Sequence, residues 1–333
     1  MKLKDTLKYR NIWLGCAMIW IVLYHTDFRV PISLLGFFKG MGYGGVDICL
    51  FASGIGCYYS MKDNSDVLGF MRRRFKRLAP TYWCFLVVWF VCKSFMGNFK
   101  LSAVLGNVLG IQSFTGQGNE FNWYISALIL MYILAPIFKE IVDRITKNYQ
   151  IFLMLLLLIA VSIVYWDADK FIIIMTRIPI FYMGMVYARL CCEGKDLKKI
   201  SIIMLICAMF IGVGMYFFFR LFFEDYLWKL GLYWYPFILI TPGLCVILSL
   251  FIHAFESRHW CEWIQKVLSV IGEYSFEIYL VHLLIFEITT YLIEEMQIIL
   301  NTNITWTISL LIVGICCVVL KKMVKRIQGK FMI

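Results

Sequence analysis

A histidine and an aspartate occur in two apolar stretches of the sequence, at positions where they could meet. His25 follows the stretch IWIVLY, and Asp47 lies in GYGGVDICLF. If the two stretches form antiparallel helices, both residues lie about one helical turn from the same surface. A carboxylate beside an imidazole fixes the tautomer of the ring and raises its basicity, as a general base requires. The spacing also fits a structural hydrogen bond buried between two helices.

A basic stretch, MRRRFKRLAPTYW, occupies positions 71–83 and holds five basic residues in the six positions 72–77. Guanidinium groups bind phosphates through paired hydrogen bonds, so this stretch is a candidate site for a cytosolic polyanion. The alternative is a topological anchor, in which the basic side chains hold the segment in the cytoplasm and Tyr82 and Trp83 lie in the interfacial aromatic belt.

Three further ionisable residues lie inside apolar stretches. Glu277 and His282 fall within GEYSFEIYLVHLL, and Arg177 begins RIPIFYMG. A charged group inside a membrane costs several kcal/mol unless it is paired or hydrated, so each is a functional candidate. We predict that Glu277 and His282 line a polar cavity, whereas Glu273 lies at the cytoplasmic edge. Arg177 precedes the helix-distorting Pro179 and requires a partner in the bundle interior.

The composition excludes a water-soluble globule. Of 333 residues, 62% are hydrophobic and 16% charged, which leaves too few polar side chains to cover a surface of that size. Apolar runs approach the roughly 20 residues that a bilayer core requires. We therefore predict one all-α domain, 1–333, a polytopic transmembrane bundle of about ten spans. The spans lie at about 11–28, 43–61, 80–97, 120–138, 150–166, 170–190, 200–220, 233–255, 268–292 and 303–320.

A shorter apolar stretch, 101–114, is interrupted by glycines. It is too short for a span, so we predict a re-entrant or interfacial segment. An eleventh span is the alternative.

The distribution of basic residues predicts the orientation, because Lys and Arg accumulate in short cytoplasmic loops. With the N-terminus inside, the cytoplasmic segments are 1–10, 62–79, 139–149, 189–199, 256–267 and 321–333. They hold 4, 6, 3, 4, 2 and 5 basic residues, which is 24 of the 32 in the chain. Both termini are then cytoplasmic. The net charge of +11 has the same origin and suits anionic lipid headgroups. It does not favour nucleic-acid binding, because no folded basic face exists outside the loops.

The twelve cysteines fall mostly in apolar stretches, where they are typical small core residues. The sequence contains no Cys-x-x-Cys pair and no cluster of histidine with cysteine. We therefore predict no structural metal.

Six blocks together resemble the membrane-bound acyltransferase-3 family, in the same order and over almost the whole chain. The blocks are YRNIWLGCAMIWIVLYHT, GYGGVDICLFASGIGCYY, RRFKRLAPTYW, NWYISALILMYILAP, RIPIFYMGM and YSFEIYLVHLLI. The resemblance implies a multi-pass protein of the bacterial cytoplasmic (inner) membrane. Such proteins move acyl groups, usually acetyl from acetyl-coenzyme A, onto extracytoplasmic acceptors such as cell-surface glycans. Expected partners are acyl-coenzyme A, a glycan or lipid-linked acceptor and the bilayer. Whether the protein also forms a homo-oligomer is left open.

The resemblance also implies roles for individual residues. The essential histidine of the family falls on His25, and the acid of its Gly-Val-Asp block falls on Asp47. Its Arg-x-x-Arg pair falls on Arg74 and Arg77, which would bind the coenzyme phosphates. The intramembrane residues singled out above, Glu277, His282 and Arg177, are placed around the substrate cavity together with Trp123.

One position departs from the family pattern. The family usually has Arg or Lys eleven residues before its histidine, and this chain has Leu14 there. Arg10 lies one helical turn earlier on nearly the same helix face, so its long side chain is a candidate substitute.

These assignments imply a mechanism that crosses the membrane. The pantetheine arm of the coenzyme would pass between helices and present its thioester near His25, which would deprotonate an acceptor hydroxyl from outside. A route through an acyl-histidine is equally consistent with the sequence. The competing class is a polytopic transporter or sensor, although transport predicts two matching halves with broken helices, and the sequence shows no such symmetry.

Overall fold

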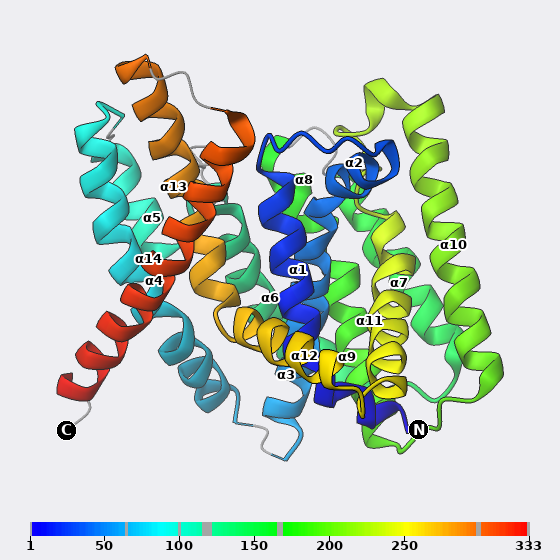
Figure 1. Ribbon diagram of the computed structural model, residues 1–333. Coiled ribbons are helices and arrows are strands. Elements are labelled where there is room, and N and C mark those ends of the chain that lie inside the picture. Colours follow the sequence, from blue (N-terminus) through cyan, green and yellow to red (C-terminus); the bar gives the residue numbers. More distant parts are fainter. Residues whose placement is uncertain are drawn as a thin grey trace.

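The computed structural model describes residues 2–63, 66–98, 101–114, 122–164, 169–297 and 301–331. Within these ranges the chain is a bundle of α-helices and short 3-10 turns without a β-strand, as predicted (Figure 1). The elements are η1 Leu3–Tyr9, α1 Arg10–Tyr24, α2 Ser33–Gly40, η2 Gly42–Gly44, α3 Gly45–Met61, α4 Val67–Phe95, η3 Leu101–Ala103, α5 Val104–Leu109, η4 Gln112–Phe114, α6 Asn122–Arg144, α7 Asn148–Val164, α8 Asp169–Met175, α9 Ile178–Cys192, α10 Lys199–Phe222, η5 Glu224–Tyr226, α11 Pro236–Ala254, α12 His259–Glu273, α13 Ser275–Met296 and α14 Thr302–Phe331.

Seven helical segments of the described chain are long and apolar enough to cross a membrane. They are Val67–Phe95, Trp123–Arg144, Phe171–Cys192, Lys199–Phe222, Pro236–Ala254, Ser275–Met296 and Thr302–Gly329. The count is eight if Ser33–Gly40 and Gly42–Met61, which are bent by 43°, form one broken span. The predicted number of about ten is therefore not confirmed. Each predicted span overlaps a helix, but α1 has 15 residues and α7 has 17, which is short for a hydrocarbon core.

The stretch 101–114 forms η3, α5 and η4, none of which is long enough to be an eleventh span. It lies against α4 and α6. The Tyr82 hydroxyl of α4 donates to the carbonyl of Asn107 over 2.7 Å, and the Ser126 hydroxyl of α6 donates to the carbonyl of Gly110 over 2.7 Å. Gly110 has φ 69°, a left-handed conformation that ends α5. The segment is thus a short helical insertion between α4 and α6, and its re-entrant or interfacial position stays a prediction.

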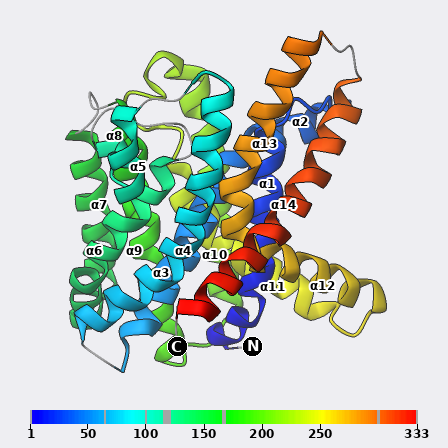
Figure 2. The same ribbon diagram turned by 90° about the vertical axis from the view of Figure 1, so that its left-hand side faces the viewer.

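The predicted span 268–292 is broken in the structure. Its first residues belong to α12, which ends at Glu273 and runs across one end of the bundle, while α13 begins at Ser275 and continues along it (Figures 1 and 2). Two glycines allow α12 to cross α1 closely. A Cβ atom on Gly15 would lie 2.1 Å from a backbone oxygen of α12, and one on Gly272 would lie 1.9 Å from a backbone oxygen of α1. This tertiary contact places the break, which the apolar pattern alone did not predict.

The two termini and the basic segments lie at one end of the bundle, and α2 lies at the other (Figures 1 and 2). Several contacts join the basic segments to one another. They are the backbone bond from Leu3 N to Lys195 O (2.9 Å), the ion pair of Lys8 with Glu256 and the bond from Arg189 Nη2 to Ile145 O (2.6 Å). The bond from Lys321 Nζ to Glu273 O (3.0 Å) joins the last basic segment to the end of α12. This end is called the basic end below.

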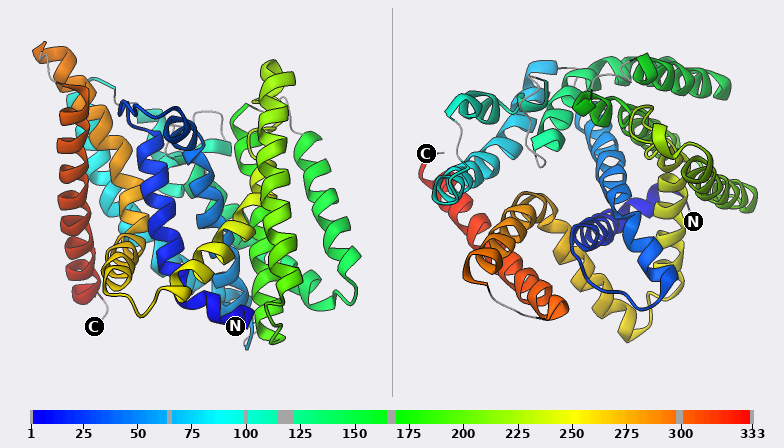
Figure 3. Two further views of the ribbon diagram at one scale, coloured as in Figure 1. Left: turned by 45° about the vertical axis from the view of Figure 1, so that its right-hand side comes forward. Right: turned by 90° about the horizontal axis from the view of Figure 1, so that it is seen from above.

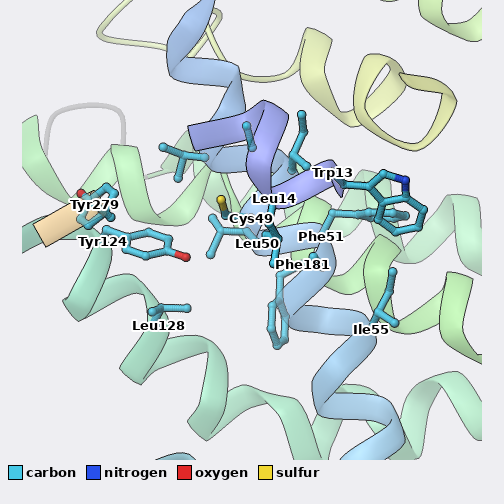
Figure 4. Packing of buried hydrophobic residues seen from close by; sticks show 14 of the residues in the cluster. Trp13, Leu14, Cys49, Leu50, Phe51, Ile55, Tyr124, Leu128, Phe181 and Tyr279 are labelled. Carbon is cyan, nitrogen blue, oxygen red and sulfur yellow. The ribbon is translucent and has the colours of Figure 1, made fainter. Parts of the chain in front are cut away.

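The core is densest around α3, which lies between α1 and α9 (Figures 3 and 4). A Cβ atom on Gly54 of α3 would lie 2.1 Å from the carbonyl oxygen of Phe181, and one on Gly184 of α9 would lie 2.1 Å from that of Phe51. The backbones of the two helices therefore touch. The fully buried Trp13 of α1 covers this contact with its ring centroid 6.5 Å from that of Phe51. Small residues thus permit the close packing that fixes α3.

The glycine contact between α3 and α9 gives a stability prediction. Gly54→Ala and Gly184→Ala should each destabilise the protein by about 1–3 kcal/mol, because the added methyl groups force two backbones apart. Gly314→Ala, in α14, is the matched control, since a Cβ atom there meets nothing within 4 Å. Thermal unfolding of the detergent-solubilised protein measures the difference. Equal melting temperatures for the three variants would contradict the close contact.

Candidate functional site

A cavity of about 430 Å³ lies inside the bundle, between α1, α3, α4, α6 and α13, and residues of α12 and α14 also line it. Its α1 wall runs from Arg10 through Leu14 and Met18 to Ile21. This wall is about 17 Å long by the helical rise. Cationic side chains line the cavity near the first residue of α1. Apolar and tyrosine side chains line the rest, together with polar residues such as Ser53, Thr81 and Glu277. The cavity therefore leads from the basic end into the bundle.

Three arginines from two helices meet where the cavity begins. Arg10 Nη2 donates to the carbonyl of Ala52 over 3.2 Å, and Arg74 Nη2 donates to that of Gly56 over 2.5 Å. Gly56 lacks a side chain, so both guanidinium groups reach the same turn of α3. The charges of Arg74 and Arg77 act on Arg10 unfavourably. Like charges held this close make the site favourable for an anion. The structure thus brings together the three predicted donor-binding residues.

The same three arginines also line a second cavity, of about 450 Å³, together with Arg73 and Tyr59. The arginines therefore stand between two adjoining spaces. A ligand with several anionic groups could contact them from both.

Arg74 differs from an ordinary interfacial anchor. Its side chain is only 8% exposed, and its guanidinium carbon lies 5.2 Å from the ring centre of Phe70 and 5.6 Å from that of Tyr132. Among the described residues, Arg74 Nε has no hydrogen-bond partner. Two aromatic rings thus hold the plane of the guanidinium while one donor remains for another group. Lys76, in the same basic stretch, is exposed.

Leu14, at the position where the family pattern has a basic residue, lines the apolar part of the cavity and is buried. Arg10 lines the same cavity one turn nearer the basic end. Arg10 and Leu14 therefore face the same cavity, and the substitution of one for the other stays a prediction.

The predicted base, His25, is the C-cap residue of α1, at the end opposite Arg10. Its Nδ1 lies 2.9 Å from the carbonyl oxygen of Ile21 and 3.4 Å from Nε2 of His282, while His282 Nδ1 lies 2.9 Å from the carbonyl oxygen of Ile278. A carbonyl only accepts, so we assign the proton of each neutral ring to Nδ1. The lone pair of His25 is then on Nε2. Ile21 lines the cavity, so His25 lies directly beyond its apolar end.

Asp47 is not the neighbour of His25 that the sequence suggested. The ring beside His25 is His282, which is fully buried. The Asp47 carboxylate is 1% exposed, interacts electrostatically with Arg177, and its Oδ2 accepts no hydrogen bond from any described residue. The predicted hydrogen bond between Asp47 and His25 is therefore absent from the structure. The depth of Asp47 follows from its place in the first turn of α3, but its direction follows from the packing of α3 against α9.

Arg177 is partnered mainly by aromatic rings. Its guanidinium carbon lies 4.7 Å from the ring centre of Trp123 and 4.8 Å from that of Trp234, and its side chain is 1% exposed. Its Nη1 donates to the carbonyl of Ile173 over 3.1 Å. Two nearby indole rings stabilise a cation that is removed from water. Arg177 and Trp123, both predicted at the substrate cavity, lie together but do not line the cavity described above.

The helix α13 joins the cavity to the histidine pair. Glu277 lines the cavity and interacts electrostatically with Lys321 and Arg77. Tyr279 also lines the cavity, with its ring centroid 5.9 Å from that of His282. Tyr279 was not predicted, although it lies three residues before His282 and hence on the same helix face. Lys321 had no such signal, because only the packing of α14 brings it to the cavity.

Comparison with known proteins identifies one family. The acyltransferase domain family matches residues 12–323, nearly the whole chain. The match contains His25, both arginines of the Arg-x-x-Arg pair and the whole of α13, and it begins two residues after Arg10. The chain has no significant match among curated proteins and none among solved structures.

The interaction of Asp47 with Arg177 predicts non-additive effects on stability. Asp47→Asn and Arg177→Met should each destabilise the protein, because each leaves the other charge buried without its counterpart. The double variant should lose less than the sum, with a coupling of at least about 0.5 kcal/mol. Unfolding of the purified variants in denaturant measures this. The control cycle pairs Asp47→Asn with Arg74→Met and should be additive. Additivity in both cycles would rule out the interaction.

Proposed function

Because the chain belongs to the membrane-bound acyltransferase family, we propose that it transfers an acyl group, most simply acetyl, from cytosolic acyl-coenzyme A to a hydroxyl of an extracytoplasmic acceptor such as a cell-surface glycan. The observation that carries the proposal is the cavity, which begins among cationic groups and leads to His25. A nucleotide thioester has the matching chemistry, with phosphates at one end and an acyl group at the other.

The donor is proposed to enter at the basic end. Its phosphates would contact Arg10, Arg74 and Arg77, since charge-assisted hydrogen bonds from guanidinium to phosphate are among the stronger polar contacts in proteins. Its uncharged arm would lie along Leu14 and Met18 in the apolar part of the cavity. The thioester would then lie near Ile21, whose carbonyl contacts His25.

The orientation in the membrane follows from the same arrangement. Basic loops favour the cytoplasmic side of the bacterial inner membrane, so the basic end would face the coenzyme pool. His25 is exposed at the opposite end of α1, where an acceptor could reach it. Donor and acceptor would therefore approach from opposite sides and meet at one residue.

The chemical step uses the lone pair that the geometry assigns to Nε2 of His25. This nitrogen takes the proton of the acceptor hydroxyl, whose oxygen attacks the thioester carbonyl. The new ester forms as the carbon–sulfur bond breaks, and the coenzyme leaves as a thiolate that is protonated afterwards. His282 positions the ring by accepting from Nδ1. An acyl-histidine route would use the same Nε2 as nucleophile, followed by attack of the acceptor.

The first test removes the base. His25→Ala should reduce acyl transfer by about 10²–10⁴-fold or more, because proton transfer to a placed group contributes about that much. Coenzyme A should still bind to the variant, since its phosphates at Arg10 would lie about 23 Å from His25 along α1. Mass spectrometry of surface glycans and lipids from expressing cells measures transfer.

The matched control for the base is His259→Ala, a histidine that is fully exposed on α12. It should retain wild-type transfer. Substantial transfer by His25→Ala would remove the proposed base. Coenzyme binding without any acylated product in wild-type cells would favour a sensor or transporter.

The second test concerns the donor arginines. Arg74→Lys and Arg77→Lys should each weaken acyl-coenzyme A binding by about 1–3 kcal/mol, because an ammonium group cannot reproduce a planar two-pronged contact. Lys76→Arg is the control, and it should bind like the wild type. Titration of purified protein with acetyl-coenzyme A measures all three. Wild-type affinity in both lysine variants would leave the basic stretch as a topological anchor.

A further inference from the structure

A fourth cation lines the cavity, and it comes from the far end of the sequence. Lys321 belongs to the C-terminal part of α14, where Lys322, Lys325 and Arg326 follow it. From the sequence alone, all four basic residues are expected to keep the C-terminal segment in the cytoplasm. The structure separates them, because Lys321 lines the cavity together with Arg74 and Arg77 whereas Lys322 is exposed.

The ammonium group of Lys321 is held at the break between α12 and α13. Its Nζ donates to the carbonyl of Glu273 over 3.0 Å and lies 3.7 Å from the ring centre of Tyr274. In the described part of the chain, no carboxylate lies within ion-pair distance of Nζ. An ammonium has three donors, so the bond to Glu273 leaves others for a ligand.

Charges around the cavity indicate what that ligand is. Glu277 interacts electrostatically with both Lys321 and Arg77, so cations from α14 and α4 face one part of the cavity. Four cationic side chains line the cavity against two carboxylates, those of Glu273 and Glu277. The remaining positive charge favours a ligand with several separate anionic groups.

We propose that Lys321 contacts a phosphate of the acyl-coenzyme A donor, which makes α14 part of the donor site. The inference rests on the proposed function and adds a residue from a different helix to the arginines of α1 and α4. The donor would then lie between α4 and α14, with phosphates bound from both sides.

The competing role for Lys321 is a tether that joins α14 to the break at Tyr274. Lys321→Gln distinguishes the two roles, because an amide retains a donor for the Glu273 carbonyl but carries no charge. Lys322→Gln is the matched control, with the same change of charge one residue away on an exposed side chain. Both variants are made in the full chain.

Binding of coenzyme A to the purified proteins, measured by titration at low and moderate salt, is the readout. Lys321→Gln should weaken binding about fivefold to tenfold at low salt, with a smaller difference at moderate salt, because salt screens the charge of a partly exposed lysine. Lys322→Gln should bind within about twofold of wild type. The melting temperature of each unliganded variant reports on the tether.

The outcomes separate the inference from the function on which it rests. Wild-type affinity in Lys321→Gln, with a wild type that binds coenzyme A, overturns the inference and leaves the proposed function in place. Equal weakening of coenzyme A binding in both variants also overturns it, since the loss of any positive charge on this segment would then have the same effect. A wild type that does not bind coenzyme A overturns both. Selective weakening in Lys321→Gln with an unchanged melting temperature supports a phosphate contact.

Discussion

The structure depends on how an apolar bundle accommodates buried guanidinium groups. A cation that leaves water costs several kcal/mol unless other groups replace its hydration. Arg177 lies close to two indole rings, and Arg74 close to a phenylalanine and a tyrosine ring, with backbone carbonyls accepting from both. These requirements fix the spacing of the helices that supply the rings and the carbonyls. The helix common to both regions is α3.

Small residues give α3 this role. On one side, Gly54 lets the backbone of α9 approach within contact distance, which places Arg177 near Asp47. Farther along the helix, Gly56 exposes a carbonyl to Arg74 and leaves room for Arg10. Larger side chains would close the space that the arginines occupy. Helix packing and charge placement are therefore set by the same short stretch, FASGIGC.

Much of the site follows from the sequence because chemistry and depth can be read from it. An ionisable residue in an apolar stretch is unusual, which singled out His25 and Glu277, and helical rise placed the histidine near one surface. Rotation about the helix axis and the crossing of distant helices cannot be read in this way. His282 stands beside His25 where Asp47 was expected, and Lys321 reaches the cavity only through tertiary packing. Hydropathy located the helices. It did not reveal that α1 is too short to count as a span, or that α12 runs across one end of the bundle and so breaks the predicted span 268–292.

The shortness of α1 affects the distance between the two ends of the bundle. Its 15 residues rise about 23 Å, against about 30 Å for the hydrocarbon core of a bilayer. Because α1 lies inside the bundle (Figure 3), lipid does not have to thin around it. With the basic end in the cytoplasm, as proposed, the protein wall along α1 would be thinner than the hydrocarbon core around the bundle. A flexible molecule held at the basic end would then reach close to the opposite face with its far end, over less than the thickness of the surrounding bilayer.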